Sequence, residues 1–183
     1  GLDFACGIPG TLGGAIYMNA GAYLESIGDS LKEVTYLDEG DNIKTIKKED
    51  MKLGYRTSIF KEKPWVILSA KLVLKKGDKE EIIDLLSDRM RRRASTQPLE
   101  YPSAGSVFRN PENMYAGALI EGCGLKGEKR GDAQISDKHA NFIVNKDQAK
   151  SKDIKYLMDL AKNKVKKKYK VDLLIEQELF NWE

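Results

Sequence analysis

The chain has very few cysteines and histidines, which removes several classes of site from consideration. Its two cysteines, Cys6 and Cys123, lack the spacing of metal ligands, so we expect neither a zinc site nor a disulfide framework. Free thiols fit a reducing compartment, and the predicted location is the cytoplasm. The single histidine, His139, is accompanied by no serine motif of the nucleophile-elbow type, so a Ser-His-Asp hydrolase is not supported. We expect a structural or solvent-exposed role for this histidine.

Long hydrophobic runs are missing as well. No apolar stretch approaches the roughly 20 residues that span a bilayer, so no membrane partner is expected. The 31 basic and 28 acidic residues leave a net charge of only +3, which provides no general field for nucleic acid. The lysine-rich run at residues 162–170 falls on the polar side of a predicted helix near its C-terminus, where cations offset the helix dipole. A solvated helix face explains this run better than a nucleic-acid-binding surface does.

The chain is long enough for two small domains, and its prolines place a boundary near residue 94. Pro98 and Pro102 follow the basic end of a predicted helix, and prolines interrupt regular structure. We therefore predict domains at residues 1–93 and 94–183. Hairpin strands and separated helices are mixed along the chain, which favours an α+β fold over a doubly wound parallel sheet.

In the first domain, the hydrophobic pattern predicts a helix that begins near Thr11, a hairpin, a further strand and a second helix. The hairpin strands are residues 31–37 and 42–46, and the further strand covers residues 65–74. Asp78 caps the second helix, with an acidic residue three positions later as in a capping box. One face of the further strand is expected to carry Val66, Leu68, Ala70, Leu72 and Leu74. The apolar stripe of the second helix is expected to be Ile82, Ile83, Leu86 and Met90.

The second domain is predicted to contain two helices and two strands. The helices cover residues 115–122 and 151–169, and the strands cover residues 141–144 and 172–180. The longer helix is expected to pack one side on the core. That side consists of Ile154, Leu157, Met158, Ala161 and Val165.

Three segments combine glycine or proline with polar residues in a way that core packing does not require. The first, Gly7–Ala15, carries four glycines, and backbone N–H groups at a helix start can bind a pyrophosphate, although a tight structural turn explains it equally well. In the second, Gly54–Lys61, Arg56 could hold a carboxylate through two hydrogen bonds, although a surface ion pair is commoner. In the third, residues 103–111, small residues around Ser106 could admit a ligand, and a serine turn is the ordinary alternative.

Taken in order, these segments resemble the UDP-N-acetylenolpyruvoylglucosamine reductases over nearly all of the chain. Several motifs agree in order and spacing, which makes the resemblance specific. They are GIPGTLGGA at residues 7–15 with MNAGAY at 18–23, YRTSIF at 55–60, GSVFRNP at 105–111, LKG at 125–127 and IEQEL at 175–179. Between Ile59 and Gln97 no tyrosine-bearing insertion is evident, which indicates the shorter subclass of the family.

The resemblance implies a flavin-dependent reductase of peptidoglycan synthesis. The implied fold is the second subdomain of an FAD-binding region of the vanillyl-alcohol-oxidase type, followed by an α+β substrate-binding domain. The family's first flavin subdomain, with another glycine-rich loop, precedes the region that matches. We therefore expect a truncated form that is inactive alone and binds FAD weakly or not at all. The implied cofactor-binding residues are Gly7, Ile8, Pro9, Gly10, Thr11, Gly13, Gly14 and Ala15.

The implied reaction is reduction of UDP-N-acetylglucosamine enolpyruvate to UDP-N-acetylmuramate, with NADPH as hydride donor through FAD. Arg56 would stabilise the charge that develops on the substrate carboxylate. Ser106 would donate a proton to the carbon that bears the ether oxygen, and Glu178 would act nearby as a partly neutral donor. The implied substrate-binding residues are Tyr55, Asn110 and Lys126, of which lysine suits a diphosphate as a mobile point charge.

Two alternatives from other classes stay open at this point. A catalytically silent sugar-nucleotide-binding module would keep the second half of the fold without its chemistry, but intact Arg56, Ser106 and Glu178 argue against it. A flavin oxidase that uses molecular oxygen would share the fold type but not the serine and glutamate motifs. The sequence therefore favours the reductase.

Overall fold

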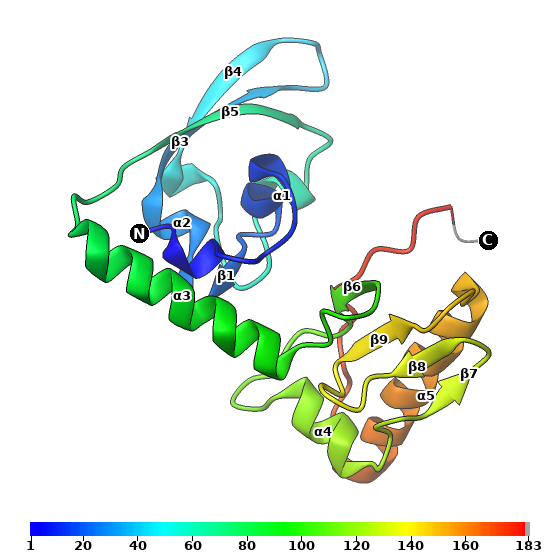
Figure 1. The fold of residues 1–183 in the computed structure, drawn as a ribbon. Helices are drawn as coiled ribbons and strands as arrows, with labels where there is room; N and C mark the ends of the chain where they lie inside the picture. Colours follow the sequence, from blue (N-terminus) through cyan, green and yellow to red (C-terminus); the bar gives the residue numbers. More distant parts are fainter. Residues whose placement is uncertain (182–183) are drawn as a thin grey trace. The chain divides into compact units, whose positions relative to one another are not determined.

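The structure of the chain, a computed structural model, describes residues 1–181 (Figure 1). The chain divides into two compact units, Gly1–Arg93 and Ala94–Glu183. Each unit combines helices with antiparallel strands, so the expected α+β class is confirmed.

The first unit contains a three-stranded antiparallel sheet, a two-stranded ribbon and one long helix. The strands are β1 (Gly21–Ala22), β2 (Glu25–Ser26), β3 (Leu31–Leu37), β4 (Ile43–Lys47) and β5 (Val66–Leu72). The helices are α1 (Leu12–Tyr17), α2 (Ile27–Ser30) and α3 (Lys79–Thr96), of which α3 continues past Arg93 into the second unit. Single 3-10 turns lie at Asp3–Ala5, Lys48–Asp50 and Ile59–Lys61. In the sheet, β3 lies between β4 and β5 and is antiparallel to both.

The predicted hairpin is confirmed as β3 and β4, and its turn is held by one carboxylate. Asp38 accepts backbone N–H bonds from Gly40 and Asn42, both at 2.9 Å. Lys44 forms an ion pair with the other carboxylate oxygen. The hydrogen bond from Lys44 and those from the turn backbone hold the pKa of Asp38 well below its usual range. The side chain therefore stays ionised and keeps the turn closed.

The predicted third strand is confirmed as β5, but its buried face is only partly the expected one. Thr35 pairs with Ser69 and Tyr36 pairs with Ile67, so Leu68 is the extra residue of a bulge. A bulge shifts the alternation by one position, because two residues then oppose one. Ala70 and Leu72 pack on the core as expected, joined by Ile67, while Val66 and Leu68 are exposed. The expectation of one uninterrupted apolar face was wrong for these two residues and for Leu74, which lies beyond the end of β5 and is also exposed.

Helix α3 begins as predicted but buries a different side chain from the expected stripe. Asp78 caps it, accepting from the backbone N–H groups of Glu80 and Glu81 at 2.9 and 3.1 Å. Within the described residues, the only side chain that α3 buries fully is Arg89. Three of the residues expected to form a packed stripe are exposed, namely Ile82, Ile83 and Met90. The expected stripe was therefore wrong, and the residue that α3 does bury is a charged one that forms ion pairs with the first unit.

Arg89 connects α3 to two earlier segments of the first unit. Its Nη1 lies 2.7 Å from Asp3 Oδ2, a pairing that is electrostatic because the N–H is not aligned on the carboxylate. Its Nη2 donates to Glu25 Oε1 on β2 at 2.9 Å. The guanidinium also lies over the ring of Tyr23, 4.6 Å from the centroid. With 8% of its surface exposed, Arg89 needs these partners to remain charged.

Replacing Arg89 with alanine is expected to lower the free energy of unfolding of the first unit by about 3 kcal/mol, because Asp3 and Glu25 lose the buried arginine with which both are paired. The exposed Arg92, paired with Asp88, is the matched control, and its alanine variant should lose less than about 1 kcal/mol. Urea unfolding followed by the fluorescence of Trp65 measures both, with Trp182 replaced by phenylalanine. Equal losses in the two variants would contradict the role assigned to Arg89.

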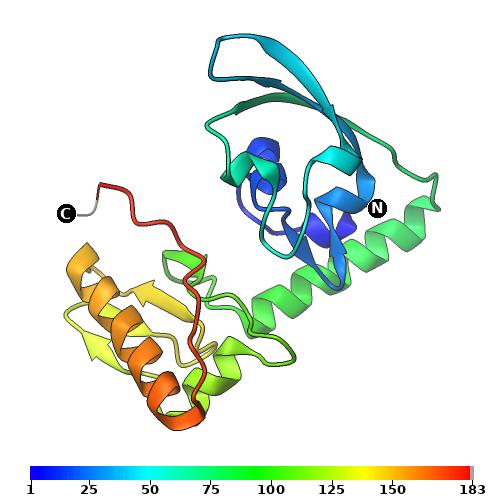
Figure 2. The same ribbon diagram turned by 180° about the vertical axis from the view of Figure 1, so that it is seen from behind.

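The second unit folds around a four-stranded antiparallel sheet in the order β6-β9-β8-β7. The strands are β6 (Ser103–Ser106), β7 (Lys129–Arg130), β8 (Ala133–Ile135) and β9 (Phe142–Asn145). The helices are α4 (Ala116–Gly122) and α5 (Ser151–Tyr169), and α5 packs on β7 and β8 of the sheet (Figure 2).

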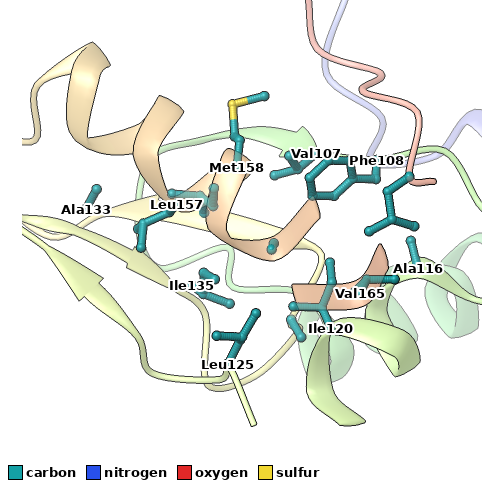
Figure 3. Packing of buried hydrophobic residues seen from close by; sticks show 14 residues of the cluster. Val107, Phe108, Ala116, Ile120, Leu125, Ala133, Ile135, Leu157, Met158 and Val165 are labelled. Carbon is teal, nitrogen blue, oxygen red and sulfur yellow. The ribbon is translucent and has the colours of Figure 1, made fainter. Parts of the chain in front are cut away.

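The core of the second unit lies between the sheet and the two helices (Figure 3). The predicted long helix is confirmed at Ser151–Tyr169, and Leu157, Met158, Ala161 and Val165 are buried on it as expected. Ile154 is partly buried against the same cluster. The predictions of α4 and β9 are also confirmed to within one residue.

The prediction of a last strand at residues 172–180 was mostly wrong. The segment forms only an isolated bridge, between Ile175 and Phe108, flanked by two backbone bonds. These run from the Arg109 N–H to the Leu174 carbonyl at 2.9 Å and from the Glu176 N–H to the Val107 carbonyl at 2.8 Å. Pairing stops there because β6 has already ended at Ser106 and a turn begins at Pro111, so the segment has only a short stretch of chain to pair with.

Candidate functional site

The glycine-rich segment Gly7–Ala15 leads into α1 and is open to solvent over much of its length. Thr11 is the N-cap, and its Oγ1 accepts the Gly14 N–H at 3.1 Å, which confirms the predicted helix start. Gly7 and Gly10 have φ of 73° and 150°, conformations that favour glycine. A Cβ placed on Gly10 would meet no atom within 4 Å, so this part of the loop presents bare backbone.

Arg56 occupies the tight turn Gly54–Thr57. The turn is closed by backbone bonds in both directions between Gly54 and Thr57, at 3.1 and 3.3 Å. Arg56 has φ of 56°, a left-handed conformation that is costly for an arginine. Its Nη2 donates to the Gly21 carbonyl at 3.1 Å, and its guanidinium lies 5.1 Å from the centre of the Tyr55 ring. The side chain is thus directed by β1 and by its neighbour, while Tyr55 itself is 56% exposed.

The second unit contains a cavity of about 310 Å³ that opens beside the end of β6. Two of the predicted site residues, Ser106 and Asn110, line it. The other lining residues come from α4 and from the loop before β9. They are Tyr115, Gly117, Ala118, Glu121, Lys138, His139, Ala140 and Asn141.

Ser106 is the last residue of β6, opposite Phe142 of β9. The register of the two strands shifts between Ser103 and Ser106, and Gly105 has φ of 75°. Two residues after Ser106, the Asn141 side chain holds Phe108 by two hydrogen bonds, accepting its N–H at 3.0 Å and donating to its carbonyl at 2.8 Å. These constraints fix the backbone on both sides of the serine at the cavity wall.

The segment that carries Glu178 runs beside the strand that carries Ser106. Gln177 donates through Nε2 to the carbonyls of Ala104 and Gly105, at 3.2 and 3.1 Å. Glu178 is the next residue, so its backbone lies against the stretch that leads into the serine. Its side chain is exposed. The structure therefore brings the segments of two predicted catalytic residues together within the second unit.

The predicted substrate-binding residues of the second unit are already engaged in the protein. Asn110 accepts the first N–H of α4, from Ala116, through Oδ1 at 3.0 Å, so it also fixes the start of that helix. Lys126 donates to Glu121 Oε1 at 2.9 Å, and Glu121 lines the cavity. Lys126 is therefore adjacent to the cavity through its ion pair, rather than part of the lining.

His139, expected to be structural or solvent-exposed, lines the same cavity. Its Nδ1 accepts the Asn141 N–H at 3.2 Å, which leaves the proton of the neutral ring on Nε2. Burial lowers its pKa, and the charge of Lys126 lowers it further while Glu121 opposes this. The cavity therefore holds a neutral imidazole near pH 7. The sequence pattern around the histidine gave no signal of this, because the opposite wall of the cavity, with Gly117 and Glu121, comes from α4, which is distant in sequence.

The chain matches proteins of one name in all three kinds of comparison. A family model for the C-terminal domain of UDP-N-acetylenolpyruvoylglucosamine reductase matches residues 97–180. The UDP-N-acetylenolpyruvoylglucosamine reductase of Clostridium novyi (strain NT) is 47% identical over 176 residues, which are 96% of this chain and 57% of the relative. The UDP-N-acetylenolpyruvoylglucosamine reductase of Petrotoga mobilis is 48% identical over 182 residues, which are 98% of this chain and 60% of the relative. The crystal structure of UDP-N-acetylenolpyruvylglucosamine reductase (MurB) from Thermus caldophilus superposes with a TM-score of 0.84 at 36% identity, over 97% of this chain and 63% of that one.

The chain belongs to the UDP-N-acetylenolpyruvoylglucosamine reductase family. It spans 57% and 60% of the length of the two curated reductases. No helix within residues 1–181 is long and apolar enough to cross a membrane. The same residues contain no group of three or more histidine, cysteine or acidic side chains placed to hold a metal ion.

The segment predicted to contact the flavin, Gly7–Ala15, offers backbone donors to an anionic group. Leu12 and Gly13 lie in the first turn of α1, where N–H groups have no partner inside the helix. With bare backbone at Gly10, the segment offers donors that an anionic group could approach. The residues thus fit one contact region of a dinucleotide diphosphate, on a surface that is open rather than enclosed.

Proposed function

We propose that this chain carries the substrate-reducing residues of a UDP-N-acetylenolpyruvoylglucosamine reductase, which converts UDP-N-acetylglucosamine enolpyruvate to UDP-N-acetylmuramate in peptidoglycan synthesis. The observation that carries the proposal is the cavity lined by Ser106, beside which the Gln177 bonds place the segment of Glu178. Residues 1–93 would form the second subdomain of a flavin-binding region, and residues 94–183 would bind the substrate. The 183-residue chain would be inactive alone.

FAD, reduced by NADPH, would supply the hydride for the enolpyruvyl double bond when bound along Gly7–Ala15. Arg56 would meet the negative charge that spreads onto the substrate carboxylate as this bond is reduced. A guanidinium already fixed by the Gly21 carbonyl and the Tyr55 ring loses little freedom when that charge develops. Such preorganisation stabilises the transition state more than the ground state. Tyr55, exposed beside Arg56, would contact the substrate.

Ser106 would donate the proton that completes the reduction, to the carbon bearing the ether oxygen. A serine hydroxyl is a weak acid, so its position must compensate for its low acidity. The constraints at Phe108 and Gly105 hold the serine backbone at the cavity wall. Glu178, carried by the adjacent segment, would hydrogen-bond to the substrate beside Ser106.

The nucleotide would be held by the cavity of the second unit, with Asn110 and Lys126 contributing. Lys126 is paired with Glu121, and a diphosphate would compete with that carboxylate for the ammonium group. The Glu121 side chain of this ion pair is 57% exposed, so replacing the Glu121 carboxylate by a diphosphate as the partner of Lys126 costs little free energy. Glu121 would therefore weaken nucleotide binding, while Lys126 strengthens it.

This proposal predicts that the 183-residue chain binds UDP with a dissociation constant of about 1 mM, because few contacts must offset the entropy of association. The imidazole of His139 gives the measurement, since it is the only histidine of the chain and produces a single pair of ring-proton signals. These signals should shift and saturate as UDP is added, and calorimetry should give the same affinity.

Two variants on one ion pair sharpen the test. Lys126→Ala should weaken UDP binding severalfold, whereas Glu121→Gln should tighten it, because the carboxylate no longer competes for the lysine. Lys164→Ala, an exposed lysine on α5, is the control and should bind like the parent. If UDP at high concentration moved no His139 signal and released no heat, the substrate site assigned to the second unit would be wrong.

A further inference from the structure

The turn that carries Arg56 depends on residues that the proposed reaction does not use. Arg56 lies at the third position of the turn Gly54–Thr57 with φ of 56°, a position that normally takes glycine or asparagine. A left-handed arginine persists only where surrounding structure enforces it. The question is which residue enforces it here.

Asn19 meets this requirement. It has 9% of its surface exposed, and both ends of its carboxamide are used. Its Nδ2 donates to the Gly54 carbonyl at 2.9 Å, which is the same oxygen that accepts the Thr57 N–H across the turn. Its Oδ1 accepts the Gly28 N–H of α2 at 3.1 Å. The side chain therefore ties the first residue of the Arg56 turn to the second helix.

The chain around Asn19 also holds the other end of Arg56. Gly21, two residues later, accepts from the arginine Nη2 at 3.1 Å. Asn19 has φ of 44°, a conformation that asparagine tolerates and most residues do not. Residues 19–21 thus fix the turn backbone through a side chain and the guanidinium through a carbonyl.

From these contacts we propose that Asn19 is a positioning residue for Arg56, acting through the Gly54 carbonyl rather than on the substrate. This inference rests on the proposed function, in which Arg56 stabilises charge on the substrate. Without the Nδ2 donor, the turn is free to relax from its left-handed conformation, and the guanidinium loses its fixed direction. Asn19 contributes to the rate only while Arg56 is present.

Asn19→Asp is the variant of choice, because it keeps the shape, the tolerance of positive φ and the acceptor for Gly28, but replaces the donor to Gly54. Asn42→Asp makes the same chemical change in the exposed β3–β4 turn of the same unit and is the matched control. A double-mutant cycle combines Asn19→Asp with Arg56→Ala in a protein of the relatives' full length that contains this chain. Its readout is the rate of flavin reoxidation by the enolpyruvyl substrate.

Asn19→Asp should slow this step about 10- to 100-fold, the range expected when a fixed group is displaced by about 1 Å. In the Arg56→Ala background, the same change should alter the rate by less than about twofold. Equal slowing in both backgrounds would overturn the inference, since Asn19 would then act on folding or on another group. Asn42→Asp should leave the rate at the parent value.

A second readout needs neither flavin nor substrate. In the 183-residue chain, the Thr57 amide donates to the Gly54 carbonyl across the turn, and its hydrogen exchange reports local opening. Asn19→Asp should speed this exchange about tenfold while Asn42→Asp does not change it. If Arg56→Ala alone left the rate of flavin reoxidation unchanged, the proposed function would fail. The hydrogen exchange of the Thr57 amide would still decide whether Asn19 holds the turn. An unchanged Thr57 rate in Asn19→Asp would refute the inference.

Discussion

Replacing Ser106 with alanine is expected to slow reduction of the enolpyruvyl substrate by about 10² to 10⁴, because that is the usual contribution of a general acid to the step it serves. The experiment uses a protein of the relatives' full length that contains this chain. Reduction of FAD by NADPH involves no proton transfer to the enolpyruvyl carbon and should run at nearly the parent rate. Stopped-flow absorbance of the flavin separates the two half-reactions.

The structure makes this substitution informative, because the backbone at Ser106 does not depend on the hydroxyl. The two Asn141 bonds to Phe108 and the Gln177 bonds to Ala104 and Gly105 hold the strand on either side. Alanine should therefore preserve the cavity wall and remove only the hydroxyl group that carries the proton. Ser103→Ala, at the exposed start of the same strand, is the control and should leave both half-reactions unchanged.

Cysteine at the same position tests proton donation directly. Ser106→Cys keeps a transferable proton and a similar size, so the rates should fall in the order serine, cysteine, alanine. If alanine slowed both half-reactions equally, Ser106 would be a structural residue of its strand. A parent rate of reoxidation in the alanine variant would assign the proton to another group.

The sequence predicts elements best where local pattern and tertiary packing agree. The α5 stripe of Leu157, Met158, Ala161 and Val165 has helical spacing and a core to pack on, so both its bounds and its buried side were predictable. The hairpin was predictable for the same reason, since the turn chemistry of Asp38 is local.

The errors fall where distant residues decide the outcome. The bulge at Leu68 depends on pairing with β3, which period-2 alternation within β5 cannot reveal. The burial of Arg89 depends on Asp3 and Glu25, more than 60 residues earlier in the chain. The isolated bridge at Ile175 depends on where β6 ends. Each is a long-range contact between residues whose own sequence neighbourhood favours another structure.

The candidate site shows the same division. Motif resemblance singled out Ser106 and Asn110, and the structure places both on one cavity. The motif resemblance gave no indication of His139. This imidazole becomes part of the site through neighbours such as Gly117 and Glu121 on α4, which only the fold brings close to the histidine. Asn19 lies within the MNAGAY motif, but the motif does not indicate that this side chain holds the Arg56 turn. Its importance follows from one bond to Gly54, 35 residues away.

The 183-residue chain is expected to bind FAD no more tightly than about millimolar and to be colourless when purified. Cofactor sites usually bury 70–90% or more of a ligand's surface, and affinity follows from contacts on all sides. The segment Gly7–Ala15 offers bare backbone at Gly10 and the first turn of the six-residue helix α1, but on an open surface. A few hydrogen bonds to exposed backbone contribute little net free energy, because water makes the same bonds when the ligand is absent.

The measurement compares this chain with a protein of the relatives' full length that contains it, purified in parallel. The longer protein should carry near-stoichiometric flavin, visible as a yellow colour. About two fifths of the length of the two curated reductases lies outside the region that this chain matches, and that part can supply further contacts to the cofactor. Added FAD should be quenched only weakly, and without saturation in the micromolar range, by the 183-residue chain. A yellow preparation of this chain with near-stoichiometric flavin would show that the 183 residues enclose the cofactor by themselves. In that outcome, Gly14→Asp, which places a carboxylate at the start of α1, should release the flavin by repelling its diphosphate, and an unaffected flavin content would place the cofactor away from the glycine-rich segment.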